Sequence, residues 1–392
     1  MNQNHGPLFR VVKRENTRWY HLAVSYASAI AAALLIGALL LSVQGVPAGA
    51  FFRDMFSLGV IGSKFAYKNV EGFIRLFIPL LITSVALSLA FRMRFWNVGG
   101  EGQFIIGALC AGFVAFRLDA LLTSLAGESW GDAVWGKLLM VVCMALAGFF
   151  GGGLYGVIAA VLKVKYGTNE TLLTLMLNYI ALYLILFFGE TKAGWNFFLS
   201  TESERPIFAT FPAVAKMITL PTPFGRFSLN LSLIVAVLIC AGIFVYLKYT
   251  KQGYEIAVVG DSPSTAMYAG MKVGRIVIRT VFLSAALIGL AGAFYASSAG
   301  TLSTSITNDV GWTGVTVAWL SKLNTAAIFV SSLFLTVLQY GSQVASTSYP
   351  TVDANFAKLL QGVILFAVLA ADFFTRFKLV GRTKAKRQEV LG

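Results

Sequence analysis

The stretch Phe73-Ile-Arg-Leu-Phe-Ile-Pro-Leu-Leu-Ile-Thr-Ser-Val-Ala-Leu-Ser-Leu-Ala90 decides the fold class of this chain. It holds eighteen residues and a single charge, Arg75. A helix of that length and polarity is suited to crossing the hydrocarbon core of a bilayer. Similar runs recur along the chain, so the sequence predicts an α-helical membrane protein.

The composition supports this prediction. Of 392 residues, 57% are hydrophobic and only 12% are charged, whereas soluble domains are about 25% charged. The 38 glycines suit membrane helices, in which small residues let backbones approach closely. The net charge of +14 is explained by basic cytoplasmic loops, so nucleic acid is not expected as a partner.

Ten apolar segments predict an all-α, polytopic transmembrane domain over residues 20–374. They are Tyr20–Leu41, Phe73–Ala90, Phe104–Phe116, Lys137–Val161, Thr171–Phe188, Leu229–Leu247, Val277–Ser298, Trp312–Ser321, Thr325–Ser342 and Phe356–Phe374. The third and eighth are too short to cross a core of about 30 Å, so we expect them to be short, broken or re-entrant. Segments two to five and seven to ten share the order long, short, long, long in opposite orientations, which predicts an inverted five-plus-five repeat.

The basic residues predict the orientation of these segments. With both termini in the cytoplasm, cytoplasmic segments hold 20 of the 31 basic residues but only 7 of the 17 acidic residues. This asymmetry follows the positive-inside rule. Residues 1–19 and 375–392 are then basic cytoplasmic tails, and the N-terminus leads into an uncleaved first helix.

Three stretches carry information beyond hydropathy. They are Phe95-Trp-Asn-Val-Gly-Gly-Glu-Gly-Gln-Phe-Ile-Ile-Gly-Ala108, Asn169-Glu-Thr-Leu-Leu-Thr-Leu-Met-Leu-Asn-Tyr-Ile-Ala181, and Val259-Gly-Asp-Ser-Pro-Ser-Thr-Ala-Met-Tyr-Ala-Gly-Met271 with Ser284-Ala-Ala-Leu-Ile-Gly-Leu-Ala-Gly-Ala293. From about Pro79 to Asp372, the chain resembles the permeases of the ribose/galactose-type ABC importers. It is most similar to the branch for nucleosides and simple sugars that works with basic-membrane-protein-type binding lipoproteins. It departs from that pattern in its long basic N-terminus and in Gly100, where alanine is usual.

This resemblance implies the permease subunit of an ATP-driven importer in a bacterial plasma membrane. Two permease subunits, identical or related, would sit on cytoplasmic ATPase subunits, which bind the ATP and magnesium. An extracellular solute-binding lipoprotein would deliver a small polar solute, a nucleoside or alternatively a simple sugar. The chain itself is expected to be no enzyme and to bind no cofactor. An ion-coupled secondary transporter is the alternative from another class, although such proteins tend to bury several ionisable residues in their spans, and here the span interiors are nearly free of charge.

A polar cluster around the start of the third segment is a candidate for the substrate pathway. Glu101 belongs to a membrane segment, where an acid is costly unless it is paired or faces water. Asn97 is expected to cap the helix, with Glu101 and Gln103 in its first turn. Two roles stay open for this cluster. One is a capped helix start with an ion pair from Glu101 to Arg92 or Arg94, and the other is direct contact with the solute or a gate.

Three further residues are candidates for the same pathway. Asn178 lies at helical spacing from Thr174 and would either bond to a neighbouring helix or contact the solute. Trp312 and Trp319 are seven residues apart on one face of the short eighth segment. Stacking on a nucleobase or sugar would suit them, as would a place at the membrane interface.

A charged stretch over residues 248–276 connects two spans on the cytoplasmic side. After a Ser-Pro-Ser turn, Ala266, Ala269 and Gly270 are expected to form the small-residue face of a short helix. By the resemblance, this is the coupling helix that docks into the ATPase; an ordinary amphipathic loop is the alternative. The residues assigned to the ATPase contact are Glu255, Asp261, Pro263, Ala266, Ala269 and Gly270.

Two stretches are similar to nucleotide-binding motifs, but neither is expected to bind a nucleotide. Gly131-Asp-Ala-Val-Trp-Gly-Lys137 begins like a P-loop, but Leu138 replaces the Ser or Thr that binds magnesium. Gly151-Gly-Gly-Leu-Tyr-Gly156 matches G-x-G-x-x-G inside a predicted span, where helix packing explains it better. The only histidines, His5 and His21, lie near the N-terminus, so no histidine-based catalytic or metal site is expected.

Overall fold

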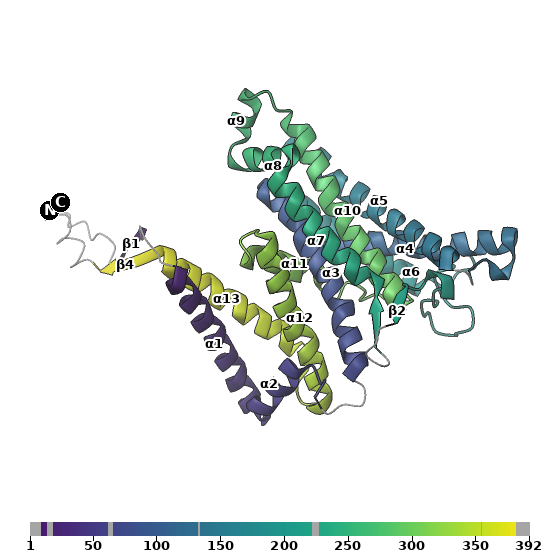
Figure 1. Ribbon diagram of the computed structural model, residues 1–392, viewed down its shortest axis with the longest axis horizontal. Helices are drawn as coiled ribbons and strands as arrows, with labels where there is room; N and C mark the ends of the chain where they lie inside the picture. The colour runs from purple at the N-terminus through teal and green to yellow at the C-terminus, as the bar shows by residue number, and fades with distance from the viewer. Residues whose placement is uncertain are drawn as a thin grey trace. The chain divides into compact units, whose positions relative to one another are not determined.

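The computed structural model describes residues 9–13, 19–61, 66–131, 134–221, 227–353 and 355–381. Within these residues the regular structure is almost entirely helical, which confirms the predicted all-α fold (Figure 1). The helices are α1 (Trp19–Val43), α2 (Ala48–Ser57), α3 (Ala66–Arg92), α4 (Gly100–Ala126), α5 (Val134–Tyr166), α6 (Glu170–Glu190), α7 (Leu231–Tyr249), α8 (Lys251–Asp261), α9 (Pro263–Tyr268), α10 (Val273–Ala299), α11 (Val310–Leu320), α12 (Thr325–Ser348) and α13 (Phe356–Arg376). Short 3-10 turns occur at η1 (Glu128–Gly131) and η2 (Ala213–Ala215). Two small antiparallel sheets pair β1 (Phe9–Lys13) with β4 (Phe377–Gly381), and β2 (Thr219–Pro221) with β3 (Ser228–Asn230).

The predicted spans correspond closely to these helices. Among the described residues, nine helices are long and apolar enough to cross a membrane, and α11 is a shorter apolar helix of 11 residues. A short eighth segment is therefore confirmed, and so is a multi-pass architecture of about ten segments. The inverted repeat stays a prediction.

The prediction that the third segment is short or broken is wrong. α4 continues without a break for 27 residues. Charges near residue 117 end the apolar run in the sequence, but they do not end the helix. The Arg117 guanidinium lies 4.2 Å from the centre of the Phe197 ring, and this favourable contact accommodates the charge on a helix that continues past it.

Contacts divide the chain into two compact units, which we describe separately. The first joins Met1–Ser57 with Gly341–Gly392, and the second is Leu58–Tyr340. In the first unit, α1 packs against α13. The ring of Phe51, from α2, meets the rings of Tyr349 and Phe356 at centroid distances of 5.8 and 5.4 Å.

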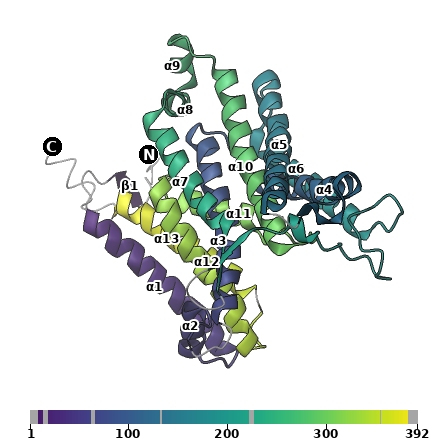
Figure 2. The ribbon, with the colours of Figure 1, turned by 45° about the vertical axis from the view of Figure 1, so that its right-hand side comes forward.

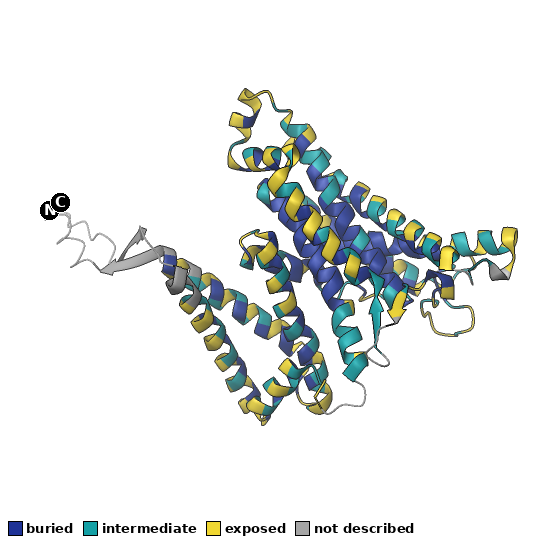
Figure 3. Ribbon diagram, in the orientation of Figure 1, coloured by how far each residue is buried: buried dark blue, intermediate teal, exposed yellow. Residues whose placement is uncertain are grey.

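The second unit has its core along α3 and α10. Buried residues run along α3 without a break from Leu76 to Phe91, and Figure 3 shows the same continuous burial in dark blue. α10 packs against α4 and α5, and Figure 2 shows it running beside α5. Glycine makes this approach possible, because a Cβ at Gly289 would overlap the carbonyl oxygen of Gly148 and one at Gly107 would overlap the backbone of Gly289. Small residues at helix contacts thus explain much of the glycine content.

Candidate functional site

The polar cluster around the start of α4 is a hydrogen-bonded network in the second unit. Asn97 and Gln103 form a reciprocal amide pair, in which Gln103 Nε2 donates to Asn97 Oδ1 at 2.9 Å and Asn97 Nδ2 donates to Gln103 Oε1 at 3.1 Å. Both side chains are buried. The prediction that Asn97 caps α4 is wrong, because the N-cap is Gly99. Asn97 instead accepts from the Gly99 N–H at 3.1 Å, so it shapes the turn that leads into the helix.

Glu101 connects α4 to the short helix α11. Its Oε1 accepts hydrogen bonds from the backbone N–H groups of Gly311 at 2.8 Å and Trp312 at 3.2 Å. These donors lie in the first turn of α11, where N–H groups have no partner within the helix and the helix dipole favours a negative charge. The N-cap of α11, Asp309, makes no side-chain cap bond. Glu101 therefore caps α11 from a different helix.

The predicted alternative of an ion pair from Glu101 to Arg92 or Arg94 is wrong within the described residues. Glu101 is 8% exposed, and its carboxylate bonds to the start of α11. Arg92 donates instead to the carbonyl of Leu323 at 2.7 Å. Glu101 is thus a buried acid that accepts hydrogen bonds from two backbone N–H groups of α11.

Asn178 connects α6 to the same network. Its Oδ1 accepts from the Gly102 N–H at 2.8 Å, and its Nδ2 donates to the carbonyl of Val98 at 2.9 Å. The hydroxyl of Thr174, one turn earlier, accepts from the Val98 N–H at 3.2 Å. Asn178 thus bonds to a neighbouring segment, one of the two roles expected for it. The structure adds Thr174, which the sequence analysis named only for its helical spacing from Asn178.

Glycines allow the backbones of α4 and α11 to touch. A Cβ at Gly100 would lie 3.3 Å from the Gly311 Cα, and one at Gly311 would overlap the Glu101 nitrogen. A Cβ at Gly102 would lie 3.0 Å from Asn178 Oδ1. The alanine usual at position 100 would therefore fit only with a small shift, whereas any side chain at Gly311 displaces backbone.

The two tryptophans of α11 have different surroundings. Trp319 stacks on Trp96, with ring centroids 5.0 Å apart and an interplanar angle of 12°, and also contacts Phe91. Trp96 and Trp319 are 43% and 42% exposed. Trp312 is 45% exposed, and its backbone N–H is held by Glu101. Contact of Trp312 or Trp319 with a solute stays a prediction, and so does such contact by Asn97, Glu101, Gln103 and Asn178.

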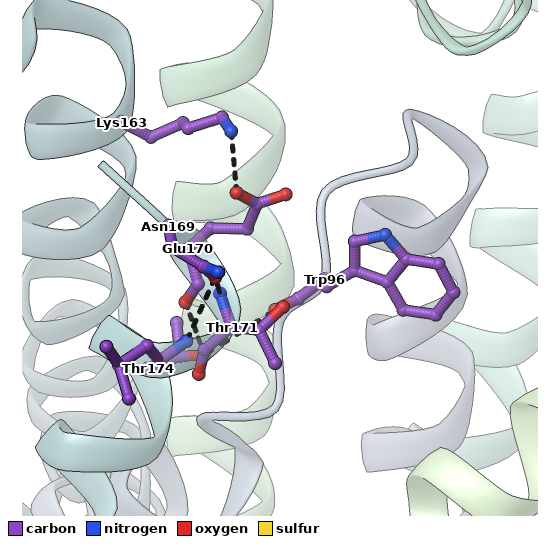
Figure 4. A network of polar contacts seen from close by, with 7 residues as sticks. Trp96, Lys163, Asn169, Glu170, Thr171 and Thr174 are labelled. Carbon is purple, nitrogen blue, oxygen red and sulfur yellow. Dashed lines mark hydrogen bonds and ion pairs between the residues drawn. The ribbon is translucent and has the colours of Figure 1, made fainter. Parts of the chain in front are cut away.

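The turn between α5 and α6 is fixed at the same end of the bundle (Figure 4). Asn169 caps α6 by accepting from the N–H groups of Thr171 and Leu172, at 3.0 and 3.2 Å. Glu170 forms an ion pair with Lys163 of α5 at 2.7 Å. Figure 4 shows how these contacts and the Thr174 hydroxyl hold the start of α6 near the Trp96 backbone.

The predicted ATPase contact lies in two short helices, α8 and α9. Thr250 caps α8 by accepting from the Gly253 N–H, and Ser262 caps α9 by accepting from the Thr265 N–H. Glu255 in α8 forms an ion pair with Arg279 in α10 at 3.0 Å. The caps fix the starts of the two helices, and the ion pair attaches α8 to α10.

The small-residue face expected in this segment does not form as predicted. α9 ends at Tyr268, so Ala269 is its C-cap and Gly270 follows it with a φ of +77°. Ala266 is fully buried in a core cluster with residues of α3, α5 and α10. Asp261, Pro263, Ala269 and Gly270 are exposed and Glu255 is partly buried. Whether these residues contact an ATPase stays a prediction.

The exposed face of this segment carries large apolar side chains that the sequence analysis did not single out. Tyr268 is 94% exposed, Met267 is 60% exposed, and Tyr254 is 64% exposed. Exposed apolar side chains that gather next to an expected partner site are the signal that was available, because exposed apolar patches mark interaction sites.

The second unit thus combines a glycine-lined helix core, a buried polar joint at a short helix, and an exposed segment between two spans. A family model described as "Branched-chain amino acid transport system / permease component" matches residues 69–369. The chain belongs to this permease family. The matched part includes the whole α4 network and the α8–α9 segment.

Curated relatives of the permease align over most of its length. A nucleoside ABC transporter permease protein from Lactococcus lactis subsp. cremoris is 25% identical, over 87% of this chain and 88% of that protein. A guanosine ABC transporter permease protein from Bacillus subtilis is 27% identical, over 94% of this chain and 98% of that protein. A glucose ABC transporter permease protein from Haloferax volcanii is 25% identical, over 89% of this chain and 87% of that protein. No solved structure matches the permease.

Proposed function

We propose that the permease is the membrane-spanning subunit of an ATP-driven importer for nucleosides. The observation that carries this proposal is the alignment with a guanosine permease over 94% of this chain and 98% of that protein. A second nucleoside permease aligns over 87% of the chain. Family membership disfavours the alternative of an ion-coupled secondary transporter.

The proposed complex needs partners for energy and delivery. Cytoplasmic ATPase subunits would bind ATP and magnesium and dock on the exposed α8–α9 segment. A second permease subunit, identical or related, would complete the pathway, and an extracellular solute-binding lipoprotein would supply the solute. In a bacterial plasma membrane, both termini and the α8–α9 segment would face the cytoplasm, in agreement with the distribution of basic residues.

The α4 network would act as a joint in this transport cycle. Glu101 holds the first turn of α11, and Asn178 holds the first turn of α4. The exposed rings of Trp312 and Trp319 lie on the helix that this joint orients. We propose that movement of α11 changes access to the pathway and that these rings stack against the base or sugar of the solute.

A simple sugar is the second candidate solute, and the glucose permease among the relatives favours it. One experiment decides between the solutes and also tests the energy source. Uptake of radiolabelled guanosine, uridine, ribose and glucose is measured in cells with and without the permease, before and after ATP depletion with the proton gradient held.

The proposal expects nucleoside uptake that depends on the permease and is lost on ATP depletion. Uptake of a sugar alone would select the second candidate. Uptake that survives ATP depletion but collapses with the proton gradient would overturn the proposal in favour of a secondary transporter.

A further inference from the structure

The second unit contains a polar cavity of about 360 Å³ that the proposed pathway does not use. Its walls come from the first turns of α3, the end of α10, the loop before β2, and β3. Its polar lining includes Glu71, Arg75, Lys216, Ser228, Asn230 and Ser298.

One wall of this cavity is fixed by buried or partly buried hydrogen bonds. The Ser228 N–H and hydroxyl both donate to Glu71 Oε1, at 3.0 and 2.8 Å. Asn230 Nδ2 donates to the Ser298 hydroxyl at 2.7 Å. β3 is thereby attached to α3 and to α10, so the protein's own hydrogen bonds hold this wall in place.

Another part of the lining holds the backbone on both sides of Lys216. The residues before and after Lys216 both bond to Ser297 at the end of α10. The Met217 N–H donates to the Ser297 carbonyl at 3.0 Å, and the Ser297 hydroxyl donates to the Ala215 carbonyl at 2.8 Å. The aliphatic stem of Lys216 lies across Gly300, where a Cβ would be 3.4 Å from Lys216 Cε. Gly300 has a φ of +72°, so glycine there serves both the turn and the passage of the lysine stem.

The cavity carries an excess of positive charge. Arg75 and Lys216 are exposed, and neither makes a hydrogen bond or an ion pair with any of the residues that the structure describes. The one carboxylate of the lining, Glu71, is occupied by Ser228. Two cations are therefore available in the lining, and an arginine with a lysine is a suitable pair of donors for a carboxylate.

The cavity lies at the opposite end of α10 from the α8–α9 segment, which Figure 1 shows by the positions of α9 and β2. A helix of the 27 residues of α10 is roughly 40 Å long. If the ATPase docks at α8 and α9, the cavity opens on the other side of the membrane. That is the side from which the solute-binding partner approaches.

We propose that this cavity receives an acidic side chain of the solute-binding partner, with the carboxylate between the Arg75 guanidinium and the Lys216 ammonium. The proposal rests on the proposed function, because it requires an importer fed by a binding protein. A nucleoside or simple sugar carries no charge that would need two cations, so the anionic group belongs to the protein that delivers the solute. Charge complementarity of this kind gives specificity and rapid association at an interface.

The test uses the complete transporter in proteoliposomes and the lipoprotein with which it functions. The Kd of the solute-loaded lipoprotein is measured at several salt concentrations for the unaltered transporter and for Arg75→Glu with Lys216→Glu. The double variant is expected to bind at least about tenfold more weakly and to reverse the salt dependence, so that binding improves as salt rises, because salt screens the repulsion between like charges. Arg205→Glu is the matched control, since Arg205 is exposed in the same inter-helix loop as Lys216 and makes no bond within the described residues.

Two further measurements keep the outcome clear. Arg75→Gln with Lys216→Gln removes the charges with less disturbance, and its basal ATPase activity reports intact folding. Restoration of binding to the Glu variants by an acid-to-lysine change in the lipoprotein would support the pocket directly.

If uptake is ATP-dependent but both double variants keep the original Kd and salt dependence, the pocket assignment is overturned and the proposed function stands. Absence of ATP-dependent uptake by the unaltered transporter would overturn both.

Discussion

The start of α4 and the α8–α9 segment contain similar types of residue, but the first region buries its side chains and the second exposes them. Both contain glycines and acidic side chains next to apolar spans. Around the start of α4, the polar side chains of Asn97, Glu101 and Gln103 are buried and bonded within the protein. In α8 and α9, large side chains such as Tyr268 are exposed. The first region is an internal joint, whereas the second presents a surface, and composition alone does not separate these roles.

The largest expected effect comes from breaking the joint by steric overlap. A Cβ at Gly311 would overlap the Glu101 nitrogen and lie 2.8 Å from the Gly100 carbonyl carbon, and backbone atoms have little room to retreat. Gly311→Val is expected to destabilise the permease by about 3 kcal/mol or more, measured as loss of a monodisperse peak and of thermal stability in detergent. Gly242→Val is the control, because a Cβ there meets nothing within 4 Å. Equal stability of the two variants would contradict the close contact of α4 and α11.

Removal of the buried acceptor is expected to have the next largest effect. Glu101→Ala leaves the N–H groups of Gly311 and Trp312 without their partner, which costs about 2–3 kcal/mol. Glu101→Gln keeps an acceptor oxygen and should cost about 1 kcal/mol. Thermal unfolding in detergent measures both. If Gln were as damaging as Ala, the negative charge rather than the acceptor would be the important feature of Glu101.

A substitution in the exposed segment should affect coupling more than stability. Gly270→Trp places a side chain where a Cβ meets nothing within 4 Å, although the φ of +77° adds a cost of about 1 kcal/mol. The variant is expected to insert normally and to uncouple ATP hydrolysis from uptake, measured as the ratio of the two rates in proteoliposomes. Gly270→Ala, which has the same backbone strain without the bulk, is the control. Normal coupling in the Trp variant would remove Gly270 from the ATPase contact.

The smallest expected effect on stability comes from truncating the most exposed aromatic residue. Tyr268→Ala should change the free energy of unfolding by no more than about 0.5 kcal/mol, because the side chain is 94% exposed. Binding of the ATPase subunit should nevertheless weaken about tenfold, since exposed aromatic residues often anchor interfaces. Co-purification and titration of the ATPase measure this effect, and Tyr179→Ala on α6, also exposed, is the control. A clear loss of stability with unchanged ATPase binding would place Tyr268 among structural residues.

Local signals predicted several features of these two regions correctly. The apolar runs marked the spans, and Glu101 and Gln103 lie in the first turn of α4 as expected. The expected cap by Asn97 failed because Asn97 pairs with Gln103 instead. The cap and the pair with Gln103 both join residues that are close in sequence. Which of them Asn97 forms depends on the shape of the turn before α4, and hydropathy does not describe that shape.

The sequence by itself determined the membrane class, the order and approximate number of the apolar helices, and the residues that carry the family resemblance. These features depend on local hydropathy, length and motif, and they do not require distant contacts. Only the tertiary structure decided that Glu101 binds the backbone of Gly311, 210 residues away, and that Arg75 and Lys216 line one cavity. Backbone donors have no side-chain signature in a sequence, and the meeting of distant cations is set by helix packing. Both therefore become visible only when the chain is folded.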